Sequence, residues 1–131
     1  ETDREYFAVK ATPTPAILKI LKEEGCGCDC SSLTELMMAE KCGVTGEGIM
    51  FSSNNTPAEE FQLADRLGAI INLDDLTLVD FLKESIGHIP ETISCRYNPG
   101  GMSRSVMISS IIREMQNTDL QQSSYLKALR F

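Results

Sequence analysis

The sequence of 131 residues lacks features that define several large classes of protein. Its longest apolar runs, such as 68–73, are far shorter than the roughly 20 residues of a membrane span, and no apolar leader precedes Tyr6. Basic residues are the minority, 12 against 19 acidic ones, and the net charge of −7 argues against binding to nucleic acid or an anionic membrane surface. We therefore expect a cytoplasmic protein with no nucleic-acid partner and no membrane partner.

The sequence also lacks a cysteine pattern that would support a disulfide scaffold. Its five cysteines are an odd number, and three of them alternate as Cys26, Cys28 and Cys30. Alternation would place three sulfurs on one face of a strand, which leaves a zinc site as the alternative interpretation. The CxxC spacing and the second ligand pair of most zinc sites are missing, however, so we predict small buried hydrophobic residues and no metal.

What the sequence does contain is a regular alternation of short apolar runs with helical patterns. Its hydrophobic content of 42% is enough for a core. Strands are predicted to begin about 20 to 24 residues apart. The predicted strands are Tyr6–Ala11, Cys26–Ser31, Ile49–Ser53, Ala69–Asp74 and Thr92–Tyr97, and the predicted helices are Ala16–Glu24, Leu33–Cys42, Pro57–Leu67 and Leu76–Ile86.

Start and stop signals support these helices. Pro15 suits the first turn of a helix, and Ser32 with Glu35 has the spacing of a capping box. Thr56, Pro57 and Glu59 mark the start of the third helix. Glycines follow each helix, at positions 25, 43, 68 and 87, where a left-handed conformation ends a helix at little cost.

This alternation predicts an α/β fold with parallel strands joined by right-handed crossovers, which means a barrel or a doubly wound sheet. The near-constant period favours the barrel. Five strands cannot close an eight-stranded barrel, which typically takes about 250 residues. We therefore predict a partial (β/α)8 barrel domain over residues 1–101, followed by a different segment over residues 102–131.

Lys10 is the first candidate for chemistry because it lies near the carboxyl end of the first predicted strand, where barrel enzymes place catalytic groups. Burial disfavours the ammonium form of a lysine, and a neutral amine can condense with an aldehyde. The alternative is a strand-end lysine that extends its ammonium group into water.

The segment from Tyr6 to Pro13, YFAVKATP, resembles the lysine signature of the pyridoxal-phosphate-dependent family that contains alanine racemase and the ornithine and diaminopimelate decarboxylases. The resemblance continues in order along the chain, and the run Arg96 to Gly101 favours the diaminopimelate branch. Its further segments are Gly27–Ser32, Glu35–Leu36, Ile49–Asn55, Ile71–Asp74 and Arg96–Gly101.

The resemblance implies a set of site residues. Lys10 would carry pyridoxal 5′-phosphate, and Asp29 and Arg96 would help to bind it. Ser31 and Asn54 would lie at the same mouth of the cavity. From the residues alone, Asp29 could instead cap the following helix, and Arg96 could form a structural ion pair.

The function implied by the resemblance is decarboxylation of meso-diaminopimelate to lysine, in a homo-oligomer. His88, between Gly87 and Pro90, does not match the family's stacking histidine, and we predict that it is exposed in a loop. Segments that complete the site in the family, such as the glycine-rich phosphate loop, are not found in the sequence. The alternative is therefore a noncatalytic α/β piece that self-associates, and we expect no turnover from this chain alone.

Residues 102–131 differ in character, with a net charge of +2 and many serines and glutamines. We expect the resemblance to stop at Gly101. If the codons for Val106–Gln121 are read one base out of frame, they are compatible with a continuation of the family's sequence. The hypothesis is that a one-base frameshift near Gly101 produced the tail. Sequencing of the coding DNA would test it. In the frame as given, helical patches are predicted at Val106–Met115 and Ser123–Leu129.

Overall fold

The computed structural model describes residues 4–97 and 104–107, and residues 96, 97 and 104–107 by their backbone only. Strands and helices alternate along the chain up to residue 97. The elements are β1 (Tyr6–Ala8), η1 (Val9–Ala11), α1 (Pro15–Glu23), β2 (Gly27–Cys30), α2 (Leu33–Lys41), η2 (Gly46–Gly48), β3 (Ile49–Ser52), α3 (Ala58–Arg66), β4 (Ile70–Leu73), α4 (Leu78–Ile86), β5 (Ile93–Tyr97) and β6 (Arg104–Met107).

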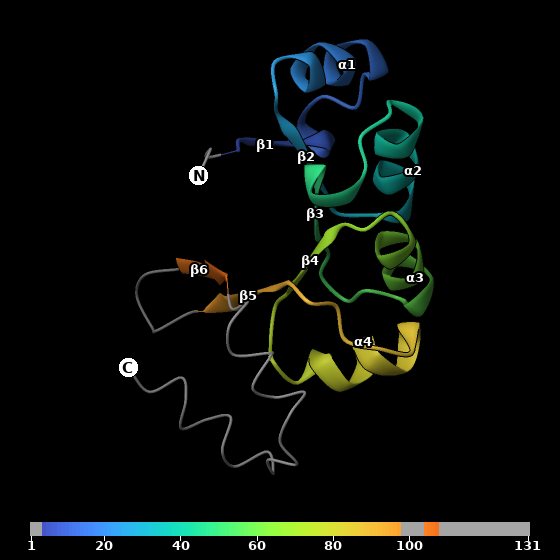
Figure 1. Ribbon diagram of the computed structural model, residues 1–131, viewed down its shortest axis with the longest axis vertical. Coiled ribbons are helices and arrows are strands. Elements are labelled where there is room, and N and C mark those ends of the chain that lie inside the picture. The colour runs from blue at the N-terminus through green and yellow to red at the C-terminus, as the bar shows by residue number, and fades with distance from the viewer. Residues whose placement is uncertain (1–3, 98–103, 108–131) are drawn as a thin grey trace.

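The strands form one sheet in which each strand pairs with the next one in the sequence. Strands β1 to β5 are parallel, and β6 is antiparallel to β5. Helices α1 to α4 all lie on one side of this sheet (Figure 1). A doubly wound sheet would carry helices on both faces, so the structure confirms the partial barrel among the two predicted folds.

Two predicted elements need correction. The strand expected over Tyr6–Ala11 ends at Ala8, because the Thr12 N–H donates to the Val9 carbonyl at 3.2 Å and closes a 3-10 turn over Val9–Ala11. The helix expected from Val106 is wrong at its start, because Val106 pairs with Cys95 in β6. The backbone groups along the edge of β5 supply hydrogen-bond partners that a helix there would leave unused.

The other elements predicted up to residue 97 are found within two residues of their expected bounds. Helices α1, α2 and α3 end in the same arrangement, shown by α2: the Val44 N–H donates to the Ala39 carbonyl, and the Gly43 N–H donates to the Glu40 carbonyl. Gly43 has φ +77°, a conformation that a side chain would strain. The glycine predicted to end each helix therefore also turns the chain toward the next strand.

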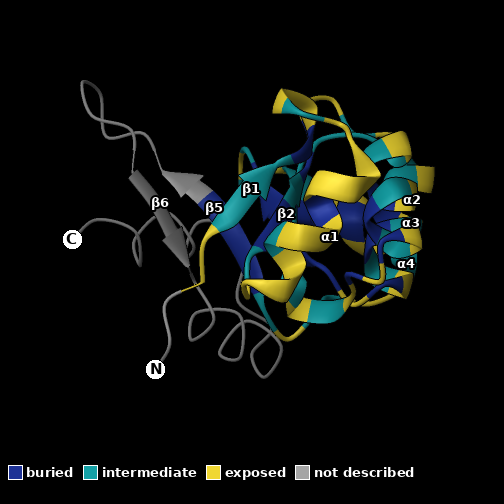
Figure 2. Ribbon diagram, turned by 90° about the horizontal axis from the view of Figure 1, so that it is seen from above, coloured by how far each residue is buried: buried dark blue, intermediate teal, exposed yellow. Residues whose placement is uncertain are grey.

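The hydrophobic core lies between the sheet and the helices, where the buried residues gather in Figure 2. Phe51 of β3 and Phe61 of α3 meet edge to face with ring centroids 6.3 Å apart. Cys28 and Cys30 are part of this core, which confirms their interpretation as small buried hydrophobic residues. All five cysteines are free. No helix within the described residues is long and apolar enough to cross a membrane.

Candidate active site

The face of the sheet turned away from the helices, called the inner face here, carries a different set of residues from the core face. Cys28 and Cys30 lie in the core, so Asp29 between them points to the inner face. The same alternation on the neighbouring strands places further side chains there. The inner-face residues of the central strands are Asp29, Met50, Ser52, Ile70, Asn72 and Ser94.

Lys10 lies two residues beyond the end of β1, in the turn η1, which packs against β2. Its side chain is exposed, and within the described residues it forms no hydrogen bond or ion pair. Val9 before it is fully buried in the core and anchors the turn. The amine is therefore held at the carboxyl end of the sheet and is accessible to a ligand.

Asp29 is half-buried and lies opposite Ala8 in the parallel register of β1 and β2. Its Oδ1 accepts a hydrogen bond of 2.6 Å from the Ser52 hydroxyl on β3. The alternative role for Asp29, as the cap of α2, does not hold, because Ser32 is the N-cap and accepts from the Glu35 N–H at 3.4 Å. Asp29 therefore remains available on the inner face next to the strand that leads to Lys10.

Ser31 and Asn54 follow the ends of β2 and β3, and the parallel strands bring both to the same end of the sheet as Lys10. Ser31 has a structural partner, because its N–H and its hydroxyl donate to the Glu35 carboxylate at 2.7 and 3.1 Å. Asn54 is exposed. Arg96 lies in β5 with its backbone paired to Ser105, and its side chain is outside the described part of the chain.

Sequence reasoning did not identify Glu60 or the hydroxyl of Ser52 as site residues. Glu60 of α3 accepts from the Leu33 N–H at 3.0 Å and from the Ser53 hydroxyl at 3.1 Å. Its carboxylate thus connects the start of α2 to the end of β3. A signal for Ser52 was present, because a polar residue next to a buried Phe51 in a strand has to face the opposite side of the sheet.

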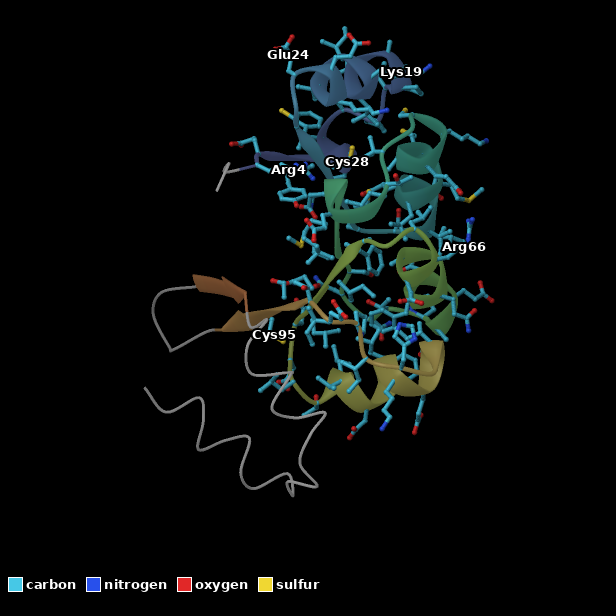
Figure 3. All side chains as sticks on the ribbon, in the orientation of Figure 1. Arg4, Lys19, Glu24, Cys28, Arg66 and Cys95 are labelled. Atoms are coloured by element: carbon cyan, nitrogen blue, oxygen red, sulfur yellow. The ribbon has the colours of Figure 1, made fainter. Side chains whose placement is uncertain are left out.

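Two ion pairs lie away from the carboxyl end of the sheet. His88 has a side-chain exposure of 54% and its Nε2 lies 3.0 Å from Asp65 Oδ1, which confirms the exposed position that was predicted. Arg66 lies on the outer surface of α3, away from the sheet (Figure 3), and pairs with Glu40 at 3.1 Å. The Arg66–Glu40 pair connects α3 to α2, the His88–Asp65 pair connects the loop after α4 to α3, and neither pair belongs to the inner face.

The buried thiols of the core are poor nucleophiles. Burial raises the pKa of the Cys30 thiol far above its usual value, and the neighbouring Cys28, Glu35 and Asp29 raise it further. Burial is also the main cause of the raised pKa of Cys28 and Cys95. Because the thiolate is the reactive form, these cysteines serve packing and not chemistry.

Comparison with known proteins identifies the family. The sequence model of the family described as "Pyridoxal-dependent decarboxylase, pyridoxal binding domain" matches residues 3–115. Protein TabA of Pseudomonas amygdali pv. tabaci is 43% identical over 122 residues, which are 93% of this chain and 26% of TabA. Diaminopimelate decarboxylase of Thermoplasma acidophilum is 35% identical over 97 residues, which are 74% of this chain and 23% of that enzyme.

Solved structures agree with this assignment. The crystal structure of diaminopimelate decarboxylase from Helicobacter pylori complexed with L-lysine has a TM-score of 0.58 and 26% sequence identity, over 63% of this chain and 21% of that chain. The chain belongs to the pyridoxal-dependent decarboxylase family and contains part of its pyridoxal-binding domain. It spans about a quarter of the length of the relatives that it matches.

The similarity continues past Gly101, where we expected it to stop. The family match ends at residue 115, and the similarity to TabA covers 122 of the 131 residues. Residues 98–103 and 108–131, including the Asn98–Gly101 motif and the predicted helix Ser123–Leu129, lie outside the described residues. The division of the chain at Gly101 stays a prediction. The frameshift origin of the tail also stays a prediction, which sequencing of the coding DNA would test.

Proposed function

We propose that this chain carries the cofactor-attaching part of the family activity that decarboxylates meso-diaminopimelate to lysine with pyridoxal phosphate, and that Lys10 is the residue that attaches the cofactor. The observation that carries the proposal is an accessible amine at the carboxyl end of the sheet, within the domain that binds pyridoxal in this family. When bound, the cofactor supplies an electron-withdrawing ring that stabilises the charge left as carbon dioxide departs. The amine of Lys10 and the carboxylate of Asp29 on the adjacent strand are groups that such a cofactor could use.

The proposed roles are supported by positions in the fold for Lys10 and Asp29, and by the family resemblance for Arg96. Lys10 offers an amine to the cofactor's aldehyde carbon, and the reaction needs that amine without its extra proton. Asp29 offers a carboxylate on the adjacent strand, and Arg96 is proposed to bind the cofactor or the substrate carboxylate. Ser31 and Asn54 would line the mouth of the cavity at the carboxyl end of the sheet.

The choice of substrate rests on two observations. The run Arg96 to Gly101 resembles the diaminopimelate branch, and a relative with 35% identity is a diaminopimelate decarboxylase. Protein TabA is more similar, but its name states no reaction. A role in lysine biosynthesis, a cytoplasmic location and a homo-oligomeric state belong to the same proposal.

The first test is cofactor attachment. Adding pyridoxal phosphate to the protein should produce an absorbance band near about 420 nm. Lys10→Ala should abolish the band, and Lys19→Ala is the matched control, because Lys19 is also an exposed lysine, on α1. An unchanged spectrum of the wild-type chain, or a band that survives Lys10→Ala, would overturn the proposal for Lys10.

The second test is turnover. Carbon dioxide release should be measured from meso-diaminopimelate and from L-ornithine at the same concentration. Faster release from meso-diaminopimelate would support the proposed substrate, whereas release only from L-ornithine would contradict it.

A second candidate function is a noncatalytic module that associates with another copy of itself. One observation favours it: within residues 4–97 and 104–107, no strand pairs with the edge of β1 that faces away from β2. Such an edge is a template for pairing with a further strand. Light scattering tests this candidate, because a monomer over a hundredfold range of concentration would exclude it, and a stable dimer without turnover would favour it.

A further inference from the structure

We propose that Ser52 is a positioning residue, whose hydroxyl holds the Asp29 carboxylate in the orientation that the cofactor site requires. This inference rests on the proposed function. Its basis is the hydrogen bond of 2.6 Å from Ser52 Oγ to Asp29 Oδ1. That length is typical of a hydroxyl that donates to a charged carboxylate, which is among the stronger hydrogen bonds in proteins.

The register of the sheet explains why Ser52 reaches Asp29. Asp29 lies directly opposite Met50, so Ser52 is its diagonal neighbour, two residues further along β3 toward the carboxyl end of the sheet. The bond therefore draws the carboxylate toward the end where Lys10 lies. It occupies one carboxylate oxygen, and no other hydrogen bond to the Asp29 carboxylate is formed within the described residues. The second oxygen, Oδ2, is left for a ligand or for Lys10.

A second serine on the inner face provides a matched control. Ser94 of β5 donates to Asn72 Oδ1 of β4 at 2.8 Å, and both residues are buried. This pair also joins a hydroxyl to an acceptor on the neighbouring strand, with Ser94 directly opposite Asn72 in the register. It lacks a charged partner, and its strands β4 and β5 are two and three strands from β2, which carries Asp29. Removing the hydroxyl of Ser94 therefore tests for a general effect on the sheet.

The experiment measures the affinity of the chain for pyridoxal phosphate from the absorbance band that depends on Lys10. Ser52→Ala should weaken the apparent affinity by about tenfold, as expected for loss of a hydrogen bond to a charged group. Ser52→Thr, which keeps a hydroxyl, should restore most of it. Ser94→Ala should leave the affinity within about twofold of the wild type. Urea unfolding of each variant verifies that it is folded.

Two further measurements distinguish a positioning role from a structural one. In an Asp29→Ala background, Ser52→Ala should have no further effect on affinity, because it acts through Asp29. In the cofactor-free protein, the carbon-13 resonance of the Asp29 carboxyl group should move in Ser52→Ala and stay in place in Ser94→Ala.

The outcomes separate the two proposals. A wild-type chain without the absorbance band overturns the proposed function, and with it any role of Ser52 in binding the cofactor. A normal band with an unchanged affinity in Ser52→Ala overturns the positioning role alone. The same holds if Ser52→Ala weakens binding as much in the Asp29→Ala background as in the wild type.

Discussion

The two faces of the sheet are built from the same strands but differ in what they hold. Toward the helices, β2 to β5 present side chains such as Phe51, Ile71 and Ile93, each with no exposed surface. Toward the inner face, the same strands present Asp29, Ser52 and other polar groups in hydrogen-bonded pairs. The alternation of a strand lets one segment supply the core with every second residue and the candidate site with the others.

Folding stability comes mainly from the core face of the sheet, and the candidate chemistry lies on the inner face. The core face excludes water and carries the apolar contacts that stabilise the fold. The inner face carries polar groups that contribute less to stability, since a hydrogen bond within a protein replaces one with water. Substitutions on the two faces should therefore have different consequences, and three predictions test this difference.

The largest expected effect comes from Phe51→Ala on the core face. The loss of a fully buried ring that contacts Phe61 should lower the free energy of unfolding by about 3–5 kcal/mol. Met50→Ala is the control from the adjacent position, and because Met50 is only half-buried on the inner face, it should cost about half as much. Urea unfolding followed by circular dichroism measures both. Equal losses would show that the two faces do not differ as described.

An intermediate effect is expected at the carboxyl end of the sheet, from Glu60→Ala. This change leaves the Leu33 N–H without its acceptor and the Ser53 hydroxyl with only the Asn54 carbonyl, at 3.4 Å, so the free energy of unfolding should fall by about 1–3 kcal/mol. Glu59→Ala removes the same charge from the same first turn of α3 at an exposed position. It should change stability by no more than about 0.5 kcal/mol. If both variants lose the same stability, Glu60 acts only through its charge.

The smallest effect is a dependence on pH that arises from the core face. The pKa of the Cys30 thiol is raised on folding because the thiol is buried, so above the ordinary thiol pKa of 9.0 the unfolded chain loses this proton while the folded chain keeps it. The unfolded state then binds fewer protons, and stability falls as pH rises, by at most about 1.4 kcal/mol per pH unit for this thiol. Unfolding at pH 8, 9 and 10 should show a shallower decline in Cys30→Ala. An equal decline in the variant would refute the contribution of this thiol.

Much of the fold could be predicted from the sequence because the signals were local. Pro15, the Ser32 and Glu35 pair, and the glycines that end the helices act on their own turns, and the structure has helices at these positions. The position of Lys10 was also accessible from a contiguous motif. Its predicted place in a strand was wrong, since the turn over Val9–Ala11 depends on how the chain leaves the sheet.

The inner-face pairs could not be predicted in the same way. Ser52 and Asp29 are 23 residues apart, and so their contact depends on the register of β2 against β3. The Glu60 carboxylate accepts from the Leu33 N–H, 27 residues away in the sequence, and this contact depends on how α3 lies against α2. A shift of one residue in the register of β3 would turn the Ser52 side chain to the other face of the sheet.

By itself, the sequence determined the order of strands and helices, the parallel α/β class, the family and the lysine that marks it, because each depends on residues close together in the chain. The tertiary structure alone decided that all four helices cover one face and that Asp29 is held by Ser52 and not used as a helix cap. It also decided which polar groups of successive strands meet. Hydrogen bonds act over about 3 Å, and only the folded register brings distant residues within that range.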